Sequence, residues 1–358
     1  MAGGPRPGQV TSEQALSLIP YFSCVRLLAD QVSSLPVHAF IEIGDKRVRT
    51  DLALLDSPAV IGTNVQWVRQ LVISLAMRGN AYGLVTLRDE GGYPVAIEWL
   101  NPDEVFVDEL KPTLPVYYWQ GQVVPRENIV HIAWFVLPGK VVGLSPVSAF
   151  ANSIGVGLQA TQYGSSWFEA GGTPPGTFKN TQVEVTGTQA RDISESLASA
   201  IRGRRPIVYG KDWDYNSLRV SPEESQFIET MKMNATQIAA IFGIPPEMVG
   251  GEAGGGLTYN TVEGNGLNLL KFVLRPWLVL IESALSEVLP PSVVVQFNAD
   301  AVVRADIKTR YQAHALGISS GFLTPNEARA FEDLPPLPGG DELRAPIKLN
   351  LNQESPSD

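Results

Sequence analysis

Cysteine is nearly absent from this sequence of 358 residues. The single cysteine, Cys24, excludes an intrachain disulfide and a thiolate metal site, which suits a reducing compartment. Because it lies in the apolar run YFSCVRLLA, we expect it to be buried as a small hydrophobic side chain. Long apolar runs are also lacking: no window approaches about 18 uninterrupted apolar residues, and the N-terminus MAGGPRPGQVTSEQ has no apolar signal core. The sequence therefore predicts neither export nor a membrane segment.

The common motifs of catalytic and nucleotide-binding sites are missing as well. There is no Gly-Lys-Ser/Thr triplet, which excludes a phosphate loop of the Walker type. His38, His131 and His314 lie far apart and outside any HExxH or HxH arrangement, so we expect structural roles rather than metal binding. Ser145, in GLSPV, lacks the second glycine of a nucleophile elbow, and Pro146 after it favours a helix cap. We therefore expect no catalytic residue, no metal and no cofactor.

Acidic residues outnumber basic ones, 37 to 27, which gives a formal net charge of −10. This balance argues against an open basic groove that holds nucleic acid tightly. Positive charge is concentrated in residues 201–220, which include Arg202, Arg204, Arg205 and Lys211. Two interpretations stay open for this cluster: a solvated helix end that the helix dipole favours, or a docking or nucleic-acid contact.

The pattern of apolar residues predicts an α+β protein. Residues 1–10 are rich in glycine and proline and are expected to be disordered, whereas residues 11–140 combine helical spacing with short alternating strand segments. Three longer helices are predicted at 146–171, 222–243 and 261–289. They are followed by a buried strand, SVVVQFNA, and then by two short helices.

Two proline residues make more specific local predictions. Pro276 removes one backbone hydrogen bond from the helix at 261–289, which predicts a kink near Lys271–Phe272. Thr324-Pro325, with Glu327 three residues after the threonine, predicts a capping box at the start of the last helix.

The segment GIPPEMVGGEAGGGLTYN, residues 243–260, lies between two predicted helices and contains six glycines. A dinucleotide-binding loop needs its glycines between a strand and a helix, so this setting disfavours a nucleotide cradle. Two interpretations stay open for this segment: a lid that closes over a substrate, or a flexible loop that moves aside when a large molecule passes.

Several short segments, in this order, resemble the portal proteins of tailed double-stranded DNA bacteriophages, in particular the compact family of long-tailed phages. The segments span most of residues 15–300: GNAY (79–82), LNPDEV (100–105), IVHI (129–132), GLSPV (143–147), WFEAGGTPPGTF (167–178), QFIE (226–229), IAAIFGIPPEMVGG (238–251), TYNTVE (258–263) and LRPWL (274–278). No single segment is decisive, but their combination in this order is specific.

The resemblance implies a portal fold with a wing, a two-helix stem, a small α/β clip, a long kinked helix and a short helical crown. Carried onto this sequence, the parts follow the chain in order: the wing at 11–145 with the strand 292–299, stem helix 1 at 146–171, the clip at 172–221, stem helix 2 at 222–249, the tunnel loop at 250–260, the long kinked helix at 261–290, the crown at 305–345 and a flexible tail at 346–358.

The same resemblance implies a structural role and no enzymatic activity. Twelve copies would form a ring at one capsid vertex of the virion, assembled in the host cytoplasm, through which DNA is packaged and ejected. The implied partners are double-stranded DNA, the terminase large subunit, the major capsid protein and a head-completion or adaptor protein, with no membrane. Two alternatives stay open: an oligomeric enzyme with a glycine-rich lid, or another ring component of the capsid or tail.

Three groups of site residues follow from the resemblance. Those of the tunnel loop are Gly254, Gly255, Gly256, Leu257, Thr258, Tyr259 and Asn260. The last four are expected to reach furthest toward DNA, because the glycines before them give slack. For Tyr259 the alternative is packing on the kinked helix. Those of the clip are expected to dock the terminase: Arg202, Arg204, Arg205 and Lys211. Lys232 and Lys271 are candidates for contact with phosphates, with an ion pair to a neighbouring subunit's glutamate as the alternative.

Overall fold

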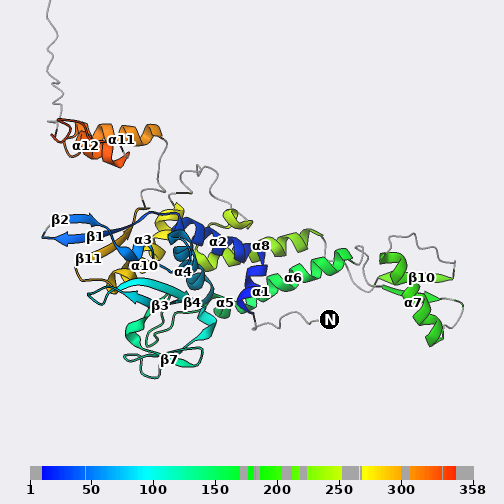
Figure 1. The fold of residues 1–358 in the computed structure, drawn as a ribbon. Coiled ribbons are helices and arrows are strands. Elements are labelled where there is room, and N and C mark those ends of the chain that lie inside the picture. Colours follow the sequence, from blue (N-terminus) through cyan, green and yellow to red (C-terminus); the bar gives the residue numbers. More distant parts are fainter. Residues whose placement is uncertain are drawn as a thin grey trace, which may run out of the picture. The chain divides into compact units, whose positions relative to one another are not determined.

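The computed structural model describes residues 10–44, 46–169, 176–180, 182, 186–202, 212–217, 224–251, 266, 268–299, 307–332 and 334–343 (Figure 1). The chain divides into two compact units. Unit 1 comprises Met1–Asn260 and Asn268–Asn298, and unit 2 comprises Thr261–Leu267 and Ala299–Asp358. None of the helices in the described part of the chain is long and apolar enough to cross a membrane.

Unit 1 begins with a layer of helices. They are α1 (Ser12–Ser17), α2 (Ile19–Ser33), α3 (Ala53–Asp56) and α4 (Asn64–Arg78). Helices α2 and α4 pack against each other through apolar faces, and Cys24 is fully buried in α2, which confirms its predicted role. Helix α4 ends at Gly79, whose φ of 68° is a left-handed conformation that glycine adopts readily.

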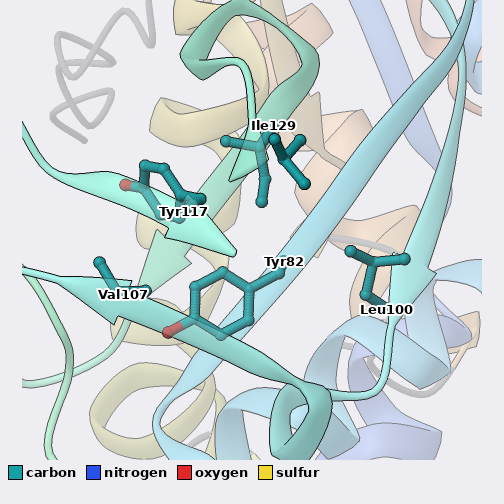
Figure 2. Close-up of a cluster of buried hydrophobic side chains, with 6 residues drawn as sticks. Tyr82, Leu100, Val107, Tyr117 and Ile129 are labelled. Carbon is teal, nitrogen blue, oxygen red and sulfur yellow. The ribbon is translucent and has the colours of Figure 1, made fainter. Parts of the chain in front are cut away.

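Two antiparallel sheets lie beside these helices. The first has the order β4-β3-β8, from β3 (Asn80–Arg88), β4 (Pro94–Leu100) and β8 (Ile129–Ala133). The second has the order β5-β6-β7, from β5 (Val105–Asp108), β6 (Val116–Trp119) and β7 (Gln122–Val124). Figure 2 shows side chains from both sheets gathered into one buried cluster, among them Tyr82, Leu100, Val107, Tyr117 and Ile129.

A third sheet joins distant parts of the sequence. Strand β1 (Val37–Ile43) pairs with β2 (Lys46–Thr50) on one side and with β11 (Val293–Phe297) on the other, both antiparallel. Strand β11 packs on α10 (Arg275–Glu287). The strand that follows the long C-terminal helix therefore completes a sheet of the N-terminal region.

The predicted helix at 146–171 is divided in the structure. A short helix, α5 (Pro146–Ala149), is followed by α6 (Ala151–Glu169), because Phe150 leaves the helical conformation with φ −111° and ψ 23°. Ser145 caps α5 as predicted, since its Oγ accepts a hydrogen bond from the Ser148 backbone at 3.3 Å. Helix α6 packs lengthwise on α8 (Glu224–Phe242).

Between α6 and α8 the structure describes a small α/β segment. Strand β9 (Gly176–Asn180) pairs antiparallel with β10 (Trp213–Ser217), and α7 (Gly187–Arg202) lies between them in the sequence. In unit 2 the described helices are α11 (Ile307–Ser319) and α12 (Pro325–Phe331). The capping box predicted at Thr324 is confirmed, with Thr324 and Glu327 each accepting from the other's backbone, at 3.2 and 2.8 Å.

Candidate functional site

Helices α6 and α8 form a closely packed pair. Ile154 of α6 and Ile238 of α8 are fully buried, and Asn234 of α8, only 3% exposed, donates from Nδ2 to the Ser153 carbonyl at 2.8 Å. Gly157 allows this approach, because a Cβ atom there would lie 2.3 Å from Asn234 Oδ1. The pairing of α6 with α8 therefore depends on the hydrogen bond of Asn234 and on the absence of a side chain at Gly157.

The C-terminal half of α8 is fixed to the helical layer. The ring of Phe242 meets that of Tyr21 of α2 edge-on at 5.6 Å, and the Tyr21 hydroxyl donates to the Ala76 carbonyl of α4 at 3.2 Å. Burial raises the pKa of Tyr21 above its ordinary value, so it stays a neutral donor. One end of the α6–α8 pair is thus held by α2 and α4.

The glycine-rich segment begins by turning back along α8. Gly243, with φ 69°, ends the helix, and a short 3-10 helix, η3 (Pro246–Val249), follows. Gly250, with φ 84°, then reverses the chain, and the Gly251 amide donates to the Pro246 carbonyl at 2.8 Å. A Cβ atom on Gly251 would lie 2.9 Å from Thr236 Oγ1. Gly251, the last described residue of this stretch, therefore lies beside α8 at Thr236.

The kink predicted near Lys271–Phe272 corresponds to a π-helix, η4 (Leu269–Leu274). In this stretch the Arg275 amide donates to the carbonyl of Leu270, five residues earlier. A π-turn is one way for a helix to accommodate Pro276, which has no N–H to donate. The next residue, Trp277, stacks on Trp134 with ring centroids 5.4 Å apart, which holds this helix against the sheet of β3, β4 and β8.

Asn80 joins the sheet region to the start of α5. Its Nδ2 donates to the carbonyls of Arg78 and Gly143, at 2.8 and 3.0 Å, and its Oδ1 accepts from the Gly143 amide at 2.7 Å. The side chain is 4% exposed. Gly79 and Gly143 pack together so closely that a Cβ on Gly143 would lie 2.2 Å from the Gly79 carbonyl oxygen. The segments GNAY and GLSPV therefore meet in one rigid joint.

The third segment in this joint is IVHI. His131 Nε2 lies 3.0 Å from Asn80 Oδ1, and its Nδ1 lies 3.1 Å from the Tyr117 hydroxyl. Because Asn80 Oδ1 only accepts, His131 donates from Nε2 and accepts at Nδ1 as a neutral ring. Burial, reinforced by the nearby charge of Arg126, lowers the pKa of His131 to about 4. His131 is thus a structural histidine, as the sequence predicts.

Glu109 fixes the chain that leads into this joint. Its carboxylate accepts from Lys140 Nζ at 2.7 Å and from the amides of Val141 and Val142 at 3.0 and 3.3 Å. These contacts, led by the Lys140 hydrogen bond, lower the pKa of Glu109 to about 2. Sequence reasoning missed both Asn80 and Glu109 as organising residues, because their partners lie more than 30 residues away along the chain.

Comparison with known proteins identifies the family. The sequence profile described as "Phage portal protein" matches residues 20–333. This chain belongs to the phage portal protein family. Among its relatives is the "Probable portal protein" of Streptomyces phage phiC31, 31% identical over an alignment that covers 97% of this chain and 81% of the relative. The α+β class is confirmed with it.

Solved portal-like structures share the fold. A chain in the structure titled "Neck of native GTA particle computed with C12 symmetry" matches with a TM-score of 0.62 and 22% identity, over 94% of this chain and 96% of that one. The crystal structure of an HK97 family phage portal protein from Corynebacterium diphtheriae matches with a TM-score of 0.63 and 15% identity, over 84% of this chain and 99% of that one.

The structure describes only some of the portal residues that the sequence singles out. Lys232 is an exposed residue of α8 and Lys271 an exposed residue of the π-helix, both in unit 1. Arg202 is the last residue of α7. The tunnel-loop residues Gly254 to Asn260, and the clip residues Arg204, Arg205 and Lys211, lie outside the described residues. Their expected roles stay predictions.

The described part of this portal protein offers no metal site, since it contains no group of three or more His, Cys, Asp or Glu side chains placed to hold an ion. In unit 2, His314 instead lies 3.1 Å from Glu332 and stacks on Phe331. Desolvation acts to raise the pKa of Glu332, but the hydrogen bonds from Arg310 and His314 outweigh it, so the pKa is lowered. His131 and His314 thus both have partners within the fold.

Proposed function

We propose that this portal protein forms a ring of twelve subunits at one vertex of a phage capsid, around a channel through which double-stranded DNA is packaged and ejected. The observation that carries the proposal is the family match over residues 20–333. The fold shared with a neck component whose structure was computed with C12 symmetry supports the ring.

Exposed apolar side chains on the long helices support assembly. They lie on α6, α8, η4 and α10: Val156, Tyr163, Met233, Phe272 and Val279. A single chain in water leaves these surfaces exposed, whereas a ring brings each subunit against two neighbours and covers them. In this arrangement the α6–α8 pair is the stem of the portal, and residues 11–145 with β11 form its wing.

The charge of the chain suits a conduit. When a protein binds double-stranded DNA, the slope of log affinity against log salt concentration is about −0.9 for each phosphate that the protein neutralises. A strongly basic lumen would neutralise many phosphates and would therefore hold DNA rather than let it pass. The net charge of −10 and the exposed Glu229 on α8 avoid such binding. Lys232 and Lys271 would then provide isolated, weak contacts to phosphates or to a neighbour's glutamate.

Further partners would dock at the remaining parts. The clip at 172–221, with Arg202, Arg204, Arg205 and Lys211, would receive the terminase and head-completion proteins. The terminase would supply ATP hydrolysis, because the sequence has no Walker motif. The major capsid protein would surround the ring, which would be assembled in the host cytoplasm and remain in the virion.

The mass of the purified protein tests the proposal directly. A portal ring predicts about twelve times the chain mass of 38.8 kDa in native mass spectrometry. A monomer or dimer at micromolar concentration would contradict the ring and favour the alternative of an enzyme with a glycine-rich lid.

Shortening the tunnel loop separates its role from assembly. Deletion of Gly254–Gly256 is expected to impair DNA packaging while the ring still forms, because the loop would lose the reach that the glycines provide. DNA content per particle and ring mass are the two measurements. Normal packaging by the shortened chain would remove the loop hypothesis and leave the ring proposal intact.

A further inference from the structure

A pocket opens between the end of α10 and the sheet of β3, β4 and β8. Its volume is about 550 Å³, within the range of about 300–1,000 Å³ that is typical of sites for small molecules. Strand β8 contributes Ile129, Val130 and His131 to its lining, and the end of α10 contributes Ala284 and Val288. All of these residues belong to unit 1. The pocket therefore offers a largely aliphatic surface to a ligand.

Four charged side chains from three elements line the same pocket. Arg88 ends β3, Arg126 and Glu127 belong to the 3-10 helix η2 (Arg126–Asn128), and Glu287 is the last residue of α10. None of the four is close enough to an opposite charge for an ion pair within the described part of the chain. Neither carboxylate accepts a hydrogen bond there. Opposite charges thus lie around one pocket without pairing with each other.

The two arginines are held in place by backbone carbonyls. Arg88 donates from Nη1 to the Gly92 carbonyl at 2.7 Å and from Nη2 to the Glu127 carbonyl. Arg126 donates from Nη1 to the Ile129 carbonyl at 2.8 Å. These bonds orient each guanidinium group without cancelling its charge, and both groups keep further N–H donors. The pocket therefore combines fixed positive charge with free carboxylates.

We propose that this pocket binds a small zwitterion with an apolar side chain, which is the chemistry of a free α-amino acid such as leucine or phenylalanine. The ammonium group pairs with the carboxylates of Glu127 and Glu287, and the carboxylate pairs with the guanidinium groups of Arg88 and Arg126. A ligand that carries both charges bridges groups that are too far apart to pair directly. A ligand with charge of one sign would instead face two like charges in the pocket.

The ligand also connects α10 to the sheet. The pocket is lined by both, and α10 packs on β8. A molecule that binds only the folded chain stabilises it by mass action, so the melting temperature should rise with the concentration of the amino acid. The inference does not depend on the ring, because every residue that it uses comes from one chain.

A matched set of ligands tests the inference on the purified full chain. Isothermal titration calorimetry with L-leucine and with L-phenylalanine, at constant pH and salt, should show saturable binding at one site per chain. N-acetyl-leucine lacks the ammonium charge, leucinamide lacks the carboxylate, and glycine lacks the apolar side chain. Each of these three analogues is expected to bind at least about tenfold more weakly than leucine, because each loses one of the three kinds of contact.

Variants of the chain locate the site. Ala284→Trp fills the pocket without removing a charge, so it should abolish leucine binding. Glu127→Gln combined with Glu287→Gln removes both carboxylates, and it should weaken leucine binding about tenfold while leaving the weak binding of N-acetyl-leucine unchanged. Glu229→Gln combined with Glu247→Gln makes the same two changes at exposed residues outside the pocket, and this control should bind leucine like the unchanged chain.

The other outcomes overturn the inference. They are the absence of saturable binding of either amino acid at concentrations up to about 10 mM, leucine binding that survives in Ala284→Trp, and equal affinity for leucine and its two charge-blocked analogues. If Ala284→Trp does not fold, the variant without both carboxylates decides in its place, and unchanged leucine binding by that variant overturns the inference.

Discussion

Adding one methyl group to either of two neighbouring glycines of α6 is expected to have opposite effects on stability. In Gly157→Ala the new Cβ would lie 2.3 Å from Asn234 Oδ1 and 2.9 Å from Leu18 Cδ2. In Gly155→Ala the nearest atom is Val10 Cγ2 at 4.0 Å, an ordinary contact. Both variants replace a glycine inside the same helix, so they share the gain in helix propensity of about 1 kcal/mol.

The difference between the two variants isolates the contact with α8. Overpacking of a closed site costs about 1–3 kcal/mol, and displacement of Asn234 loses its hydrogen bond to Ser153, worth about 1 kcal/mol. After the gain in helix propensity is subtracted, Gly157→Ala should be destabilised by ~1–3 kcal/mol, whereas Gly155→Ala should be stabilised by up to ~1 kcal/mol.

Thermal unfolding, followed by circular dichroism at one protein concentration, measures this difference. We expect the melting temperature of Gly155→Ala to exceed that of Gly157→Ala by about 3–5 °C, and native mass spectrometry to show fewer complete rings for Gly157→Ala. Equal melting temperatures would refute the close packing of α6 on α8, and with it the stem as described here.

Three further predictions concern the joint and unit 2. Asn80→Ala should lower the free energy of unfolding by about 3 kcal/mol in urea titrations, because it leaves the Gly143 backbone and His131 without their partners; a change below 1 kcal/mol would contradict the joint. The pKa of His131 is lowered from 6.5 to about 4, so its neutral form contributes stability that is complete above pH 6.5 and is lost as the pH falls toward 4. His131→Gln should therefore make the free energy of unfolding less dependent on pH in this range. An unchanged pH profile would exclude His131 as the source of the pH dependence. Thr324→Ala should lower the stability of unit 2 by about 1 kcal/mol, seen as faster amide exchange at Glu327, and unchanged exchange would show that the cap is unimportant.

Local sequence signals predicted several elements correctly. The cap at Ser145 and the capping box at Thr324 are confirmed, because each is formed by residues within three positions of one another. The burial of Cys24 follows from the apolar face of α2 in the same way. The fold class and the family could also be inferred, from the order of short segments along the chain.

Features that depend on distant contacts were not predicted. Asn80 and Gly143 are 63 residues apart, and nothing near either residue indicates that they meet. The break at Phe150 was not predicted either, whereas the π-helix at Leu269–Leu274 lies where the local signal of Pro276 predicts a kink. The predicted boundaries of wing, stem, clip and crown stay predictions.

The most direct test of the account is to image the purified protein by electron microscopy and to count the symmetry of the particles. The account predicts a ring of twelve subunits with a central channel and a flared wing. Compact particles without a channel, or a chain that stays monomeric at concentrations of tens of micromolar, would contradict it.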